Sequence, residues 1–132
     1  MLPDSFGGYA CTAMLNVQIA LPSENAPRTK RFEAVIDSGA SYCIFHADFA
    51  RHLGIDLASC PTATTLGIGG SESLYLHDLT LYIPGGPIAI RAGFKENLPI
   101  AGLLGMIGFF DHFKITFDSG GQICILERIY KA

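Results

Sequence analysis

The sequence predicts an all-β fold, a barrel or a sandwich of about eight or nine short strands. Turn-forming Gly, Pro, Asn and Asp residues recur roughly every 8–12 positions, which is the strand spacing of such folds. Residues 14–21 (MLNVQIAL) alternate between apolar and polar side chains, as a half-buried strand does. Helical signals are few and short: residues 47–53, which Gly54 ends, and residues 109–113.

The strands are predicted in order along the chain. Leu15, Val17, Ile19 and Leu21 share one face of the first strand. The remaining strands are expected at residues 32–36, 62–68, 73–83, 88–90, 103–105, 114–118 and 122–127. Gly69 and Gly70 mark a hairpin between two of these strands, and residues 84–87 (PGGP) mark the next turn.

Size and composition indicate one folded domain spanning residues 1–132. The chain is 49% hydrophobic and 16% charged, which suits a protein with a single apolar core. Its net charge is −3 and its basic residues form no cluster beyond residues 28–31, so nucleic-acid binding is not expected. No apolar run approaches the ~18 residues of a membrane span. A soluble, cytoplasmic protein is expected, either whole or as a domain of a longer one.

The cysteines and histidines suggest no chemistry. Four cysteines (Cys11, Cys43, Cys60 and Cys124) show neither a C-x-x-C pair nor the histidine spacing of a zinc site. We expect them to be small buried side chains in a reducing compartment. The histidines lack a partnering motif, no G-x-S-x-G elbow surrounds a serine, and the Gly-rich stretch GIGGS lacks the lysine of a phosphate loop.

The most informative stretch is VIDSGAS at residues 35–41, where a buried strand runs into Asp37. Gly39 permits a tight turn, and the Ser38 hydroxyl can hydrogen-bond locally and stiffen it. The carboxylate then projects from a rigid loop. Two such loops face to face share one proton and can perform general acid–base hydrolysis of a peptide bond. Taken alone, D-S-G is also a common surface turn.

Three stretches in order resemble one family. AVIDSGASYCIF at residues 34–45 resembles the signature of the retropepsin-like aspartic proteases, apolar-apolar-Asp-[Ser/Thr]-Gly-Ala. TLGIGGSESL at residues 65–74 looks like their flap, the glycine-tipped hairpin that closes over substrate. GLLGMIGFFDHFKITFD at residues 102–118 is similar to their second motif. The match runs from about residue 14 to 127, and single-domain bacterial proteases are the nearest likeness.

The resemblance implies a closed retropepsin-like (acid protease) barrel with one or two short helices, acting as a homodimeric aspartic endopeptidase on a peptide or protein substrate. It implies that a water molecule is activated between the Asp37 side chains of two subunits, and that no metal or organic cofactor is needed. The implied site residues fall into three groups: Asp37, Ser38 and Gly39 as catalytic residues; Ala40, Leu103, Leu104 and Gly105 as support for the loop; and Ile68, Gly69 and Gly70 as the substrate-binding flap.

A second D-S-G at residues 118–120 raises the alternative of a dyad within one chain. Its flanks argue against this, because Asp118 leads into Gly-Gly and a short strand, as a tight hairpin does. A two-lobed protease would need the fold twice, and 132 residues hold it once. A C2 homodimer instead brings Asp37 to its own mate on the symmetry axis.

The sequence departs from the family pattern at one position, and two alternative functions stay open. Many relatives carry an Arg soon after the glycine of the second motif that ties the dimer together, whereas Met106 follows Gly105 here. This leaves the strength of the dimer open, and residues 125–130 are apolar enough to contribute to it. The alternatives are a catalytically silent dimerisation or peptide-binding module with this fold, and a generic β-barrel in which D-S-G is only a turn.

Overall fold

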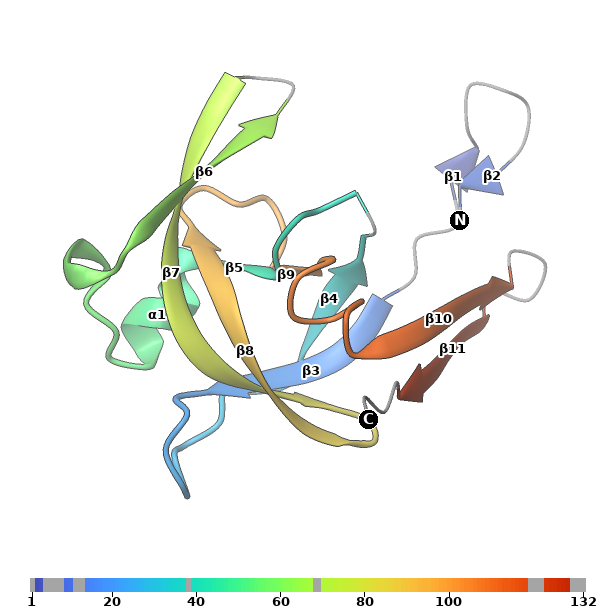
Figure 1. Ribbon diagram of the computed structural model, residues 1–132, viewed down its shortest axis with the longest axis horizontal. Helices are drawn as coiled ribbons and strands as arrows, with labels where there is room; N and C mark the ends of the chain where they lie inside the picture. Colours follow the sequence, from blue (N-terminus) through green and yellow to red (C-terminus); the bar gives the residue numbers. More distant parts are fainter. Residues whose placement is uncertain are drawn as a thin grey trace.

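The computed structural model describes residues 2–3, 9–10, 14–37, 39–67, 70–118 and 123–128. Six of its strands close into a barrel, whose arrangement can be followed in Figure 1. The strand order is β3-β4-β9-β5-β8-β7-β6, and pairing of β3 with β7 closes the ring and leaves β6 outside it. These strands are β3 (Met14–Ala20), β4 (Phe32–Ile36), β5 (Ile44–His46), β6 (Thr62–Gly67), β7 (Gly70–Ile83), β8 (Gly86–Lys95) and β9 (Gly102–Leu104). The predicted all-β fold is therefore confirmed, as a closed barrel.

The other elements of the described chain are short. They are β1 (Leu2–Pro3), β2 (Tyr9–Ala10), the helix α1 (Ala47–His52), the 3-10 turn η1 (Leu57–Ser59), β10 (Phe113–Asp118) and β11 (Ile123–Arg128). The pairs β1–β2 and β10–β11 form separate two-stranded sheets. None of the helices in this part of the chain has the length and apolar character needed to cross a membrane.

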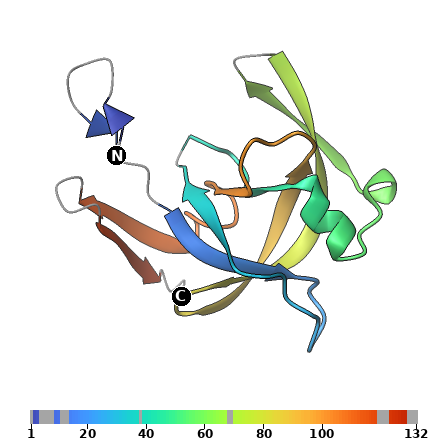
Figure 2. The same ribbon diagram turned by 180° about the vertical axis from the view of Figure 1, so that it is seen from behind.

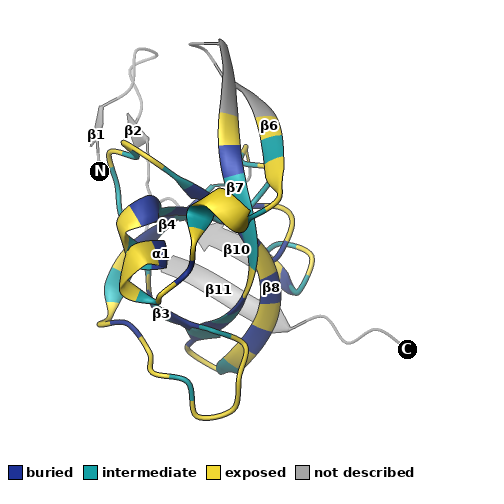
Figure 3. Ribbon diagram, turned by 90° about the vertical axis from the view of Figure 1, so that its left-hand side faces the viewer, coloured by how far each residue is buried: buried dark blue, intermediate teal, exposed yellow. Residues whose placement is uncertain are grey.

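Alternation of side chains builds the core. Val17 and Ile19 of β3 are buried, as the period-two pattern predicted, and Leu15 and Leu21 pack against the core from its margin. Along β8, buried and exposed residues alternate from Ile88 to Ala92, which Figure 3 shows as bands of colour. The centre is aromatic: Phe45 is fully buried between the rings of Phe32 and Phe94.

The helix α1 is capped at both ends by nearby residues. The Nδ1 atom of His46 accepts a hydrogen bond from the Asp48 amide at 3.0 Å, which satisfies one of the free donors of the first turn. Gly54 follows the helix with a φ of +82°, a left-handed conformation that glycine adopts without strain. The predicted helix at residues 47–53 is therefore confirmed to within one residue.

Some predicted elements differ from the structure. β7 begins at Gly70 and not at residue 73, and its register with β6 pairs Gly67 with Gly70. β8 continues to Lys95, whereas the prediction ended at residue 90. The helix predicted at residues 109–113 is wrong: residues 108–112 form turns, and β10 begins at Phe113.

Candidate active site

Asp37 directly follows Ile36, the last residue of β4. β4 pairs antiparallel with β3 and parallel with β9, in a register that places Ile36 opposite Leu104. The Asp37 amide continues this ladder and donates to the Leu104 carbonyl at 3.0 Å. Leu104 is fully buried and Leu103 half-buried, so β9 gives the aspartate a rigid base.

The residues after Asp37 fold back over its side chain. The Gly39 amide donates to Oδ1 of Asp37 at 2.9 Å, and the Ala40 amide donates to the Asp37 carbonyl at 3.2 Å. These two bonds make a tight turn that fixes the carboxylate relative to the backbone. The Asp37 side chain is half-buried and Gly39 is exposed, so the carboxylate is held in place and open to one side.

A second loop, at residues 105–107, is hydrogen-bonded to the residues that follow the Asp37 turn. Ala40 and Ser41 accept hydrogen bonds through their carbonyls from the amides of Met106 and Ile107, both at 2.9 Å. The chains are so close that a Cβ on Gly105 would lie 2.2 Å from the Tyr42 carbonyl oxygen. Glycine is therefore required at residue 105 for the two loops to cross, and the structure brings the supporting stretch directly under the Asp37 turn.

The β6–β7 hairpin extends beyond the barrel at the same end as the C-terminus of β4, as Figures 1 and 2 show from opposite sides. Of the predicted flap residues, Gly70 is the first residue of β7, and residues 68–69 lie outside the described part of the chain, as does Ser38. Asp118 pairs with Ile123 in the β10–β11 hairpin, the position expected for a turn-forming aspartate.

Comparison with known proteins agrees with this geometry. Residues 25–107 match the family model described as aspartyl protease, a segment that contains the Asp37 turn and the loop beneath it. This chain belongs to the aspartyl protease family.

Two solved structures similar to this chain share its fold. A retropepsin-like aspartic protease from Rickettsia conorii is 22% identical, with a TM-score of 0.59 and coverage of 87% of this chain and 88% of that one. The retroviral protease-like domain of Ddi1 from Leishmania major is 17% identical, with a TM-score of 0.54 and coverage of 89% and 90%. The fold is thus retropepsin-like. No curated protein matches the sequence.

The chain also carries a thiol next to this site. Cys43 is fully buried beneath the loop, and burial raises the pKa of its thiol to about 12. A thiol with that pKa stays protonated near neutral pH and is a poor nucleophile. Cys43 therefore contributes packing to the site.

Sequence reasoning found the loop but not how it is held. Tyr42 and Ile107 form a parallel bridge, and the Cys43 amide donates to the Ile107 carbonyl at 3.3 Å. These are backbone contacts between residues more than 60 positions apart (42 to 107), so no local pattern reveals them. The one sequence signal for these contacts was Gly105, a glycine between apolar neighbours. Gly105 was among the residues predicted to support the Asp37 loop.

Proposed function

We propose that this protein is an aspartic endopeptidase that acts as a C2 homodimer, with a water molecule activated between Asp37 of one protomer and Asp37 of its partner. The observation that carries the proposal is the Asp37 turn: an open carboxylate, oriented by the Gly39 amide and tied to β9. A dyad needs two such turns, and the described chain builds one barrel with one of them. A second copy supplies the other.

The chemistry follows from two carboxylates that share one proton. The ionised carboxylate takes a proton from water while the protonated one donates to the carbonyl oxygen of the peptide bond. The water oxygen attacks the carbonyl carbon, and the C–N bond then breaks as the amine leaves with a proton. In this proposal Ser38 joins the hydrogen bonds across the axis, while Gly39 and Ala40 shape the turn that keeps each carboxylate in place.

Exposed apolar side chains support the dimer. Met14, Met106 and Ile107 are the exposed large hydrophobic residues of the described chain, at 50%, 48% and 48%. Met14 pairs with Val35, just before the aspartate, and the other two are hydrogen-bonded to the Asp37 loop. All three therefore flank the turn that the proposal places on the symmetry axis, where a second copy removes them from water.

Substrate binding is proposed at the β6–β7 hairpin. A peptide lying extended between this hairpin and the Asp37 turn would pair its backbone with Ile68, Gly69 and Gly70, and alternate side chains would point to opposite sides. The proposal therefore assigns these residues the role of a flap.

The test is cleavage of an unbiased peptide library by the wild type, Asp37→Asn and Asp118→Asn, with a pepstatin-type inhibitor as a further control. The wild type and Asp118→Asn should cleave, and Asp37→Asn should lose activity by several orders of magnitude because the dyad loses its base. Equal cleavage by Asp37→Asn would refute the dyad. A folded wild-type dimer that cleaves nothing from acid to neutral pH would show a silent peptide-binding module instead.

A further inference from the structure

A pocket separate from the Asp37 turn lies between α1 and the residues that lead into β4 and β9. Its volume is about 560 Å³, within the roughly 300–1,000 Å³ of small-molecule sites. It is lined by Thr29, Lys30, His46, Asp48, Phe49, His52 and residues 98–101. Neither Asp37 nor Gly39 is among these residues.

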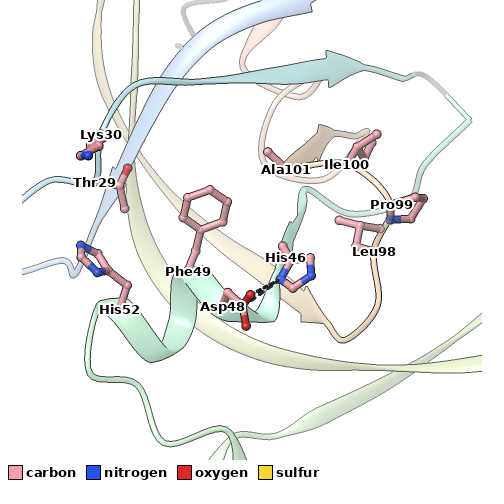
Figure 4. A pocket seen from close by; sticks show the side chains of 10 residues that line it. All are labelled: Thr29, Lys30, His46, Asp48, Phe49, His52, Leu98, Pro99, Ile100 and Ala101. Carbon is pink, nitrogen blue, oxygen red and sulfur yellow. Dashed lines mark hydrogen bonds and ion pairs between the residues drawn. The ribbon is translucent and has the colours of Figure 1, made fainter.

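One end of the pocket is apolar. Figure 4 shows Leu98 and Pro99 at this end, with Ile100 and Ala101 beside them and the Phe49 ring toward the middle. The Phe49 ring stacks on Phe32 with 4.4 Å between ring centres, so the wall is supported from behind. An apolar group placed here exchanges water contacts for a preformed surface.

The opposite end carries the donors. Figure 4 shows Lys30 and His52 together at this end, beside Thr29. Within the described residues neither Lys30 nor His52 has an ion-pair partner. The hydroxyl oxygen of Thr29 already accepts from the Ile19 amide. A positive charge and an imidazole N–H are therefore free to bind an anionic group.

The remaining charged groups are already satisfied. The Asp48 carboxylate accepts from Arg51 at 2.7 Å, and Arg51 also pairs with Glu96. Nδ1 of His46 accepts from the Asp48 amide, as described above. The pocket therefore has an apolar end and a cationic end, and its one carboxylate, that of Asp48, is paired with Arg51.

We propose that this pocket binds an amphipathic carboxylate, with its acid group at Lys30 and His52 and its apolar body along Phe49 toward Leu98 and Ile100. Two sources share this chemistry, a fatty acid and the free C-terminus of an apolar peptide. The site is separate from the proposed dyad, because neither Asp37 nor Gly39 lines it.

The experiment titrates the folded full-length protein at pH 7 with hexanoate, octanoate and octanol, each below its micelle concentration, and with acetyl-Leu-Leu. Calorimetry gives affinities, and amide NMR shifts give the location. Octanoate should bind about tenfold more tightly than octanol, since its charge is paired. Affinity should rise about fourfold for each methylene that is buried. The shifts should centre on Phe49 and Ala101, and the tighter of octanoate and acetyl-Leu-Leu identifies the source.

Variants make the result specific. Lys30→Gln combined with His52→Gln should weaken octanoate about tenfold and leave octanol unchanged, whereas Lys114→Gln, at an exposed lysine elsewhere, should change neither. Ala101→Phe should fill the pocket and abolish both, and Asp37→Asn should bind as the wild type does. Equal affinity for octanoate and octanol, insensitivity to the double variant, or shifts spread over the surface would each overturn the proposal.

Discussion

Gly105 determines where the Asp37 carboxylate stands, although it carries no functional group. The Asp37 turn is tied to β9 through the Leu104 carbonyl, and residues 40–43 then cross directly over residue 105. A Cβ there would lie 2.2 Å from one backbone oxygen and 2.7 Å from that of Ala40. Both oxygens, those of Tyr42 and Ala40, belong to the loop that follows the aspartate. Neither can shift to make room without moving the candidate site.

Replacement of Gly105 should cost more than replacement of a glycine that is required only for its backbone angle. Gly105→Ala should lower the free energy of unfolding by about 3 kcal/mol, because backbone must shift. Gly85→Ala is the matched control: its φ is +102° with nothing within 4 Å of the new Cβ, so it should cost about 1 kcal/mol. Urea unfolding of both variants measures the difference. An equal loss in the two would refute the steric account.

Cys43 should be inert in the folded protein. Burial raises the pKa of its thiol from 9.0 to about 12, so the folded state keeps a proton that the unfolded state loses near pH 9.0. Its contribution to stability is complete below that pH and is lost as pH rises toward about 12. Iodoacetamide labelling followed by peptide mapping should modify the half-buried Cys60 before Cys43 in native buffer, and both in urea. Labelling of Cys43 at the rate of Cys60 would contradict this.

At the scale of elements, β9 links the two strands that flank the Asp37 turn. It pairs parallel with β4 and antiparallel with β5, although it is only three residues long. A side chain on Gly102 would meet the Phe45 ring at 2.7 Å, so β9 lies close against the core aromatics. Loss of packing along this strand should therefore disturb the whole barrel.

Neighbouring leucines of β9 provide a matched pair. Leu104 is fully buried, whereas Leu103 on the opposite face is half-buried. Leu104→Ala should lower the free energy of unfolding by about 3 kcal/mol, through lost burial plus a cavity. Leu103→Ala should cost about 1 kcal/mol in a monomer, since its burial is partial. Chemical denaturation at low protein concentration compares them, and a reversed order would contradict the observed register.

The sequence predicts most elements because their patterns are local. Alternation located β3, and Gly54 ended α1 where expected. The misses arise from long-range contacts. Gly93 gives no strand signal, yet its Cβ would meet Leu74 at 2.9 Å, so a glycine in β8 makes room for β7. Gly108, with a φ of +103°, directly precedes the expected helix, and the Phe110 amide donates to the Gly105 carbonyl.

The candidate site was predictable in part for the same reason. Asp37 and Gly39 form a local turn, and D-S-G between apolar strands indicates it. The pocket beside α1 was not predicted, because it combines residues near positions 30, 50 and 100 that only the barrel brings together. Individually, a lysine, two histidines and a Leu-Pro-Ile stretch carry no pattern that the sequence alone could join.

At the scale of the molecule, the proposed interface is apolar. Met106→Glu or Ile107→Glu places a charge at the flank of the proposed dimer axis, so each should weaken self-association about tenfold or more. Ala58→Glu, which adds the same charge at exposed η1, should leave association unchanged. Sedimentation equilibrium at several concentrations measures this. Because no ion pair of these residues is involved, added salt should not dissociate the wild-type dimer; dissociation by salt would contradict the apolar interface.

Each chain is proposed to supply half of an active site, and mixing wild-type with inactive subunits tests this. The wild type is combined with increasing Asp37→Asn protein, subunits are allowed to exchange, and peptide cleavage is measured at fixed wild-type concentration. If the site is a dyad of Asp37 and its mate, inactive heterodimers form and the activity per wild-type chain falls in proportion to the wild-type fraction. Activity per wild-type chain that stays constant at every ratio would show that one chain is sufficient, and would contradict the account.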